Sequence, residues 1–116
     1  MELIDTHVHV IDRGRLSYPW LENVPALDRD HLFDVWQAEA RRCGITGALH
    51  MEVDVAEGDI EAEAGMVEDL TALPGSILKG AISACRPEDP RFPAFLDQVR
   101  ARPSIKGLRR VLHVVP

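Results

Sequence analysis

The chain has 116 residues, of which 46% are hydrophobic and 28% are charged, a balance typical of a globular domain with a packed core. Its net charge of -6 and isoelectric point near 5.3 argue against nucleic acid or an anionic membrane as a partner, because no basic stripe offsets the acidic excess. Cys43 and Cys85 lack CxxC spacing and are expected to be reduced thiols. With neither an export signal nor a membrane-length apolar run in the sequence, we expect a cytoplasmic protein.

The first third of the chain predicts a strand, a long loop and a helix. Residues 3–10 are short, β-branched and mostly apolar, which indicates a buried strand. Residues 11–30 predict a loop, because glycine and prolines interrupt any regular pattern. A helix should follow, with Asp28 or Asp30 as its N-cap and Gly44 as its left-handed C-terminal cap. The residues expected on its apolar face are Leu32, Val35, Trp36 and Cys43.

The rest of the chain continues this alternation. Further strands are expected at residues 46–53, 77–84 and 105–115. Between them the sequence predicts a helix opened by Asp59 and a short helix that begins near Pro93. Four strands separated by helical segments predict parallel βαβ units and an α/β fold. No helix is expected after the last strand, although a parallel sheet is normally covered on both faces.

Three polar residues alternate along the first predicted strand. Asp5, His7 and His9 would share one face, because alternate residues of a strand point the same way. Two imidazoles at this spacing can converge on one divalent ion such as zinc or on one substrate oxygen, and Asp5 could orient one of them. Such pairs are also often structural, but the position of this one on an apolar strand strengthens the functional interpretation.

Two later strands carry further candidates. Glu52 lies at the end of the second predicted strand, where His50 would share its face, and the strand ends of a parallel barrel line its active site. A strand end that emerges into solvent is an equally good interpretation, and Asp54 shares this ambiguity. Arg109 and Arg110 are adjacent and face opposite ways, so at most one of them points inward, where its planar fork suits a carboxylate or lactone oxygen.

Two more residues complete the candidate set. His113 would share the face of Arg109. Trp20 could form an apolar wall over a site, or simply pack its own loop. No glycine-rich phosphate loop or nucleophile elbow is present, so the chemistry falls to histidines, carboxylates and arginines.

Three segments, in this order along the chain, resemble a known family. They are Asp-Thr-His-Val-His-Val-Ile-Asp at residues 5–12, Tyr-Pro-Trp-Leu at residues 18–21 and Ile-Lys-Gly-Leu-Arg-Arg-Val-Leu at residues 105–112. Together they are similar to the amidohydrolase-related (amidohydrolase 2) family of metal-dependent TIM-barrel hydrolases. The resemblance is closer to its sugar-lactonase and dicarboxylate-lactonase branch, which includes L-fuconolactonase-like enzymes. It implies a partial (β/α)8 TIM barrel of about four parallel β/α units.

The resemblance also implies roles for individual residues. His7 and His9 match first-strand histidines that bind a divalent metal in some members and contact substrate in others. Glu52 matches a polar position at a strand end, and Arg109 matches an arginine that helps to hold the substrate. The family's later histidine and its water-activating aspartate have no counterpart here. Residues 1–116 are therefore expected to be the N-terminal half of a truncated barrel that lacks part of its catalytic machinery.

The leading hypothesis is a hydrolase that opens a sugar lactone or related cyclic ester. A metal or the pair His7 and His9 would polarise the carbonyl, a carboxylate would activate water, and Arg109 would hold the small-molecule substrate. The residues expected to contact this substrate are Glu52, Arg109, Trp20 and His113. Two alternatives stay open: a metal-dependent decarboxylase of the same superfamily, and a non-catalytic half-barrel that associates through its exposed sheet edges. A poorly folded fragment without function is a third.

Overall fold

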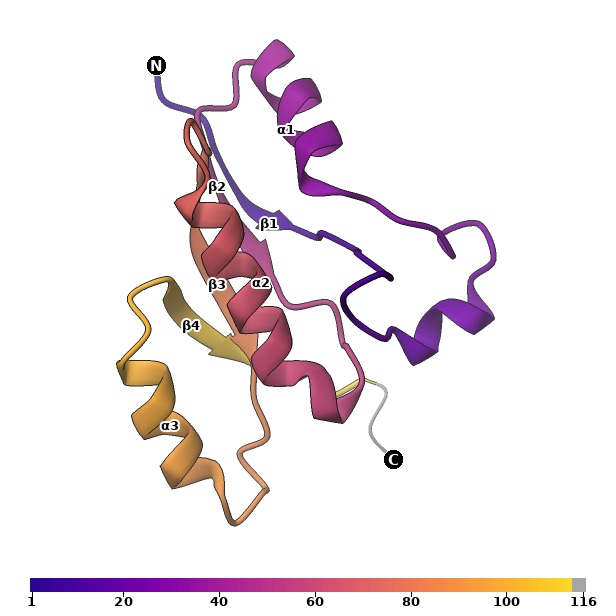
Figure 1. Ribbon diagram of the computed structural model, residues 1–116, viewed down its shortest axis with the longest axis vertical. Helices are drawn as coiled ribbons and strands as arrows, with labels where there is room; N and C mark the ends of the chain where they lie inside the picture. The colour runs from indigo at the N-terminus through magenta and orange to yellow at the C-terminus, as the bar shows by residue number, and fades with distance from the viewer. Residues whose placement is uncertain (114–116) are drawn as a thin grey trace.

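The computed structural model describes residues 1–113, which form one four-stranded parallel sheet with strand order β1-β2-β3-β4 (Figure 1). The strands are β1 (Ile4–Val8), β2 (Gly47–Met51), β3 (Leu78–Ala84) and β4 (Ile105–Arg109). The helices are α1 (Phe33–Arg42), α2 (Ile60–Ala72) and α3 (Phe92–Arg100), with short 3-10 helices η1 (Pro19–Asn23) and η2 (Glu57–Asp59). The predicted α/β alternation of parallel strands and helices is confirmed, and the four units form part of a barrel-like fold.

Each strand next to a candidate residue is shorter than predicted. β1 ends at Val8 and β2 ends at Met51, so His9 and Glu52 lie just beyond their strands. β4 ends at Arg109 rather than at residue 115, because its partner β3 ends at Ala84, opposite Arg109. Residues 110–113 are not in a strand, and the remainder of that predicted strand lies outside the described residues. Candidate side chains thus gather where the strands stop.

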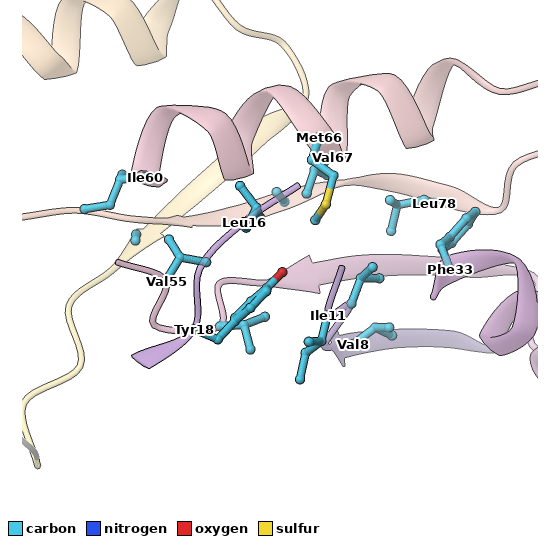
Figure 2. Packing of buried hydrophobic residues seen from close by; sticks show 14 of the residues in the cluster. Val8, Ile11, Leu16, Tyr18, Phe33, Val55, Ile60, Met66, Val67 and Leu78 are labelled. Atoms are coloured by element: carbon cyan, nitrogen blue, oxygen red, sulfur yellow. The ribbon is translucent and has the colours of Figure 1, made fainter. Parts of the chain in front are cut away.

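Helices cover one face of the sheet. Val8, His50 and Ala81 occupy one level of the strand register, so their side chains point to the same face, and all three are buried there. Met66 and Val67 of α2 pack toward this face, as Figure 2 shows. The neighbouring strand residues Met51 and Ile82 point the other way and are half-buried. Among residues 1–113, no helix is long and apolar enough to cross a membrane.

An irregularity in β1 corrects the prediction for its polar residues. Asp5 is level with Ala48 and Val8 is level with His50, so three steps along β1 match two steps along β2. The extra residue interrupts the alternation, as in a β-bulge, and His7 does not share a face with Asp5. The Asp5 carboxylate accepts a hydrogen bond from the backbone N–H of His7 (3.0 Å) instead of orienting an imidazole ring.

The start of α1 differs from the prediction. Its N-cap is Leu32, without a side-chain cap. Asp28 and Asp30 instead hold Arg13: the Arg13 side chain donates to Asp28 (3.0 Å), and its backbone N–H donates to Asp30 (2.9 Å). These local contacts fold residues 11–30 back on themselves, which satisfies the aspartates before the helix begins. The C-terminal prediction is confirmed, because Gly44 follows the helix with a φ of +81°.

The buried face of α1 is also rotated from the one predicted. Phe33 and Ala40 are buried, whereas Leu32 and Cys43 are exposed and Val35 is 64% exposed. Of the four residues predicted on the apolar face, Trp36 is the one that packs, half-buried, against the core. Phe33 lies with Val8 and Leu78 in the core (Figure 2). Burial of this large aromatic ring determines the orientation of the helix. Leu32 and Val35 are thereby left on a face that the sheet does not cover.

Candidate functional site

A cavity of about 890 Å³ opens beside the carboxyl ends of the strands. Its wall includes the segments that follow β1 and β2, the end of β4, η1 and the exposed side of α1. The structure brings five of the six candidate site residues together there, namely His9, Trp20, Glu52, Arg109 and His113. The sixth candidate, His7, is not among the described residues that line it. Leu32, the N-cap of α1, and Val35 within the helix supply part of an apolar side to this cavity.

Arg109 and Glu52 form a close ion pair in the cavity wall. Glu52 Oε1 accepts hydrogen bonds from Arg109 Nε (2.8 Å) and is 2.7 Å from Nη2. Nη2 also donates to the backbone carbonyl of Glu52 (2.9 Å). The Glu52 side chain is 2% exposed and the Arg109 side chain is 34% exposed, so the guanidinium can reach a ligand and the carboxylate holds it from behind. Glu52 does not emerge into solvent.

Residues 52–54 form a turn, hereafter the 52–54 turn, that several side chains hold in place. Glu52 Oε2 accepts a hydrogen bond from the backbone N–H of Asp54 (2.8 Å), and Trp20 Nε1 donates to the carbonyl of Val53 (2.8 Å). Glu63 Oε2 accepts from the N–H of Val53 (3.1 Å). Asp54 has a φ of +48°, which is uncommon for a residue other than glycine and is tolerated best by Asn and Asp.

His9 is held in one tautomer by its backbone partner. Its Nδ1 lies 2.9 Å from the carbonyl oxygen of Met51, which can only accept a hydrogen bond, so Nδ1 carries the proton and Nε2 keeps a free lone pair. Burial lowers the pKa of His9 below its ordinary value, and the charges of His7 and Arg109 lower it further, against the Met51 hydrogen bond and Glu52. His9 is therefore a neutral base at pH 7. The exposed ring of His7 lies edge-on to it, with ring centroids 4.9 Å apart.

Arg110 illustrates the alternation expected at the end of β4. Its Nη2 donates to Glu88 Oε1 at 2.6 Å, and the residue is not among those that line the cavity. Of the two adjacent arginines, only Arg109 faces the cavity. The sequence rule that at most one would point inward is confirmed, and the structure selects which one.

Two buried titratable residues were not among the site residues predicted from the sequence. Glu63, in the first turn of α2, is 1% exposed, and its Oε1 has no hydrogen-bond partner within residues 1–113. Glu63 lies at helical spacing from Ile60 and Val67, which places it on the buried side of the helix; this spacing is the sequence signal that could have predicted its burial. His50 is equally buried, its Nε2 has no hydrogen-bond partner in the described part of the chain, and burial lowers its pKa to about 4. It lies level with Val8 and Ala81 on the face that the helices cover, and it is not among the residues that line the cavity.

The described residues do not by themselves fit a metal centre. Within residues 1–113, no group of three or more His, Cys, Asp and Glu side chains is arranged to hold an ion. His7 and His9 would supply two imidazole ligands, whereas catalytic zinc sites use three protein ligands. Glu52 is already engaged by Arg109 and by the N–H of Asp54. A metal bound through the two histidines would need a further protein ligand that residues 1–113 do not supply.

Comparison with known proteins supports the same superfamily. No protein-family model and no curated protein matches the chain. Among solved structures, the chain is similar to a protein described as amidohydrolase 2 from Bifidobacterium longum subsp. infantis, with 28% sequence identity and a TM-score of 0.60. The match covers 73% of this chain and 33% of that one, so the chain corresponds to about a third of the length of that amidohydrolase. Fold and sequence identity together support a relationship to the amidohydrolase superfamily of TIM-barrel hydrolases.

Proposed function

We propose that residues 1–116 are the N-terminal part of an amidohydrolase-superfamily barrel, and that the cavity binds a sugar lactone and the hydroxy acid formed from it. The observation that carries this proposal is the guanidinium of Arg109, which lies in the cavity wall and is oriented by the buried carboxylate of Glu52. Its position at the carboxyl ends of parallel strands matches the place where barrel enzymes bind substrate. The likeness to an amidohydrolase supports hydrolysis as the reaction type.

The free part of Arg109 suits an oxygen-rich ligand. Nε and Nη2 are occupied by Glu52, while Nη1 makes no hydrogen bond within residues 1–113. A carboxylate or a lactone carbonyl oxygen could accept from Nη1 without breaking the pair with Glu52. Trp20, which also lines the cavity, has its indole N–H bound to Val53 and offers an apolar ring surface to the carbon face of a sugar.

Lactone opening assigns distinct roles to two residues. Water adds to the ring carbonyl, the ring C–O bond breaks, and a proton passes from the water to the ring oxygen that leaves. We assign the proton transfer to His9, whose Nε2 lone pair is free, rather than to Glu52, which Arg109 occupies. Arg109 stabilises the oxygen on which negative charge develops.

Arg109→Lys should weaken binding of L-fuconate, the open-chain acid of L-fuconolactone, by about tenfold, because lysine cannot pair with Glu52 and donate a second directed hydrogen bond at once. Isothermal titration of the 116-residue chain measures this affinity. Arg110→Lys is the matched control, since Arg110 pairs with Glu88 away from the cavity and its variant should bind like wild type. Equal affinities for both variants would contradict the assignment. Two assays distinguish a hydrolase from a decarboxylase: a hydrolase releases protons when it opens L-fuconolactone, whereas a decarboxylase releases carbon dioxide from a carboxylated substrate.

A second candidate function, assembly through the sheet edges, is favoured by two features. β1 and β4 are the edge strands, and Ile4 at the β1 edge is 51% exposed. Two copies could pair β1 of one with β4 of the other and so cover both edges. We expect sedimentation to show a concentration-dependent dimer, and Ile4→Lys to shift it to monomer. Leu73→Lys, at a residue equally exposed beyond α2, should leave it unchanged. A folded wild-type monomer at every concentration would rule out this assembly.

A further inference from the structure

We propose that Glu63 is a positioning residue of the cavity: from α2 it holds the 52–54 turn in place, and its protonation state determines how strongly Arg109 binds an anionic ligand. The second half of this statement rests on the proposed ligand binding at Arg109. The first half concerns the arrangement of the turn and stands independently of any ligand.

A single peptide unit links Glu63 to Arg109. The carbonyl of Glu52 and the N–H of Val53 belong to the same planar peptide group. Its carbonyl oxygen accepts from Arg109 Nη2 (2.9 Å), and its N–H donates to Glu63 Oε2 (3.1 Å). A rotation of this plane therefore changes both contacts together. Loss of the Glu63 acceptor would leave a buried N–H unpaired and remove one of the two groups that orient the plane.

The helix makes this support rigid. Glu63 lies in the first turn of α2, between Ile60 and Val67, which are buried in the core. Its side chain is itself buried, so it cannot exchange its contact with Val53 for water. On the other side of the turn, Trp20 donates to the Val53 carbonyl. The turn is thus fixed between a core helix and the loop that carries a cavity-lining tryptophan.

Charge at Glu63 would act on the same arginine. The groups that face it are Glu52 and Asp54 from the turn, Arg109 from β4 and Tyr18 from the first loop. The pKa of Glu63 is raised to about 7, chiefly by burial; Glu52 and Asp54 also raise it, while the Val53 hydrogen bond and Arg109 lower it. Below pH 7 the carboxyl is neutral. Above pH 7 it becomes a second anion near Arg109, which competes with an anionic ligand for the positive charge.

The test compares Glu63→Gln, which keeps an oxygen acceptor but cannot ionise, with Glu63→Leu, which has no acceptor. NMR follows the Val53 amide and the Arg109 Nε–H from pH 6 to 8.5, and isothermal titration follows L-fuconate affinity over the same range. In wild type both NMR signals should titrate near pH 7. As pH rises from 6 to 8.5, the affinity of wild type for L-fuconate should fall about fivefold more than that of Glu63→Gln, as expected for one nearby negative charge. Glu63→Leu should shift the Arg109 signal and weaken binding at every pH.

Glu61→Gln is the matched control, because Glu61 lies in the same helical turn but is exposed. It should behave as wild type in both measurements. The same pH dependence in Glu63→Gln and wild type would overturn the protonation role. An unchanged Arg109 signal in Glu63→Leu would overturn the positioning role. Absence of L-fuconate binding in every variant would refute the proposed ligand, while the two NMR signals would still decide whether Glu63 positions Arg109.

Discussion

When pH falls from 7 to 4, the free energy of unfolding should fall on the order of 3 kcal/mol less in His50→Leu than in wild type. Burial lowers the pKa of His50 from 6.5 to about 4, with the charge of His9 acting in the same direction. A folded-state pKa below the unfolded value means that this contribution is fully present above pH 6.5 and is lost as pH falls toward 4. Leucine fills similar space and does not titrate.

Urea unfolding of wild type and His50→Leu at intervals from pH 4 to 7 measures this difference. The two proteins have to be compared because Glu63 changes the free energy of unfolding with pH in the direction opposite to His50. The folded-state pKa of Glu63, about 7, lies above the ordinary value of 4.5 for a glutamate, so its contribution to stability is present at low pH and is lost as pH rises through 7. The two effects offset each other between pH 4.5 and 6.5. An unchanged pH dependence in His50→Leu would contradict the buried neutral imidazole; His7→Gln, at an exposed histidine, controls for loss of a histidine.

Glu52→Ala should lower the free energy of unfolding by on the order of 3 kcal/mol. The change removes a buried carboxylate and leaves Arg109 without its partner and the N–H of Asp54 without an acceptor. The partial exposure of Arg109 reduces the electrostatic part of this loss, so the unpaired N–H and the vacated space account for much of it. Thermal and urea unfolding of the variant provide the measurement.

The adjacent arginine offers a matched control for Glu52→Ala. Glu88→Ala removes the partner of Arg110, but Glu88 is exposed, and exposed ion pairs contribute little to stability. Its effect should be much smaller than that of Glu52→Ala. The double variant Glu52→Ala with Arg109→Met should recover part of the loss, because it removes the unpaired charge. Equal losses in Glu52→Ala and Glu88→Ala would show that the buried pair has no special structural role.

The gathering of candidate residues in one cavity was predictable to a large extent. His9 and Glu52 were predicted at or near the ends of parallel strands, and topology brings the carboxyl ends of parallel strands to one edge. Arg109 was predicted in the middle of a longer strand, and it lies at a strand end because β4 stops there. The pairing of Glu52 with Arg109 was not predictable, because the two residues are distant in sequence and only the register of β2, β3 and β4 brings them together. Their roles in binding and catalysis stay predictions.

The sequence by itself determined the order of strands and helices and the left-handed end of α1 at Gly44, because these features depend on neighbours a few residues apart. Only the tertiary structure decided the bulge that separates the faces of Asp5 and His7, and the rotation of α1 that buries Phe33. It also decided that a glutamate of α2 supports the 52–54 turn. Each of these depends on contacts between distant segments, where packing and strand register outweigh local pattern.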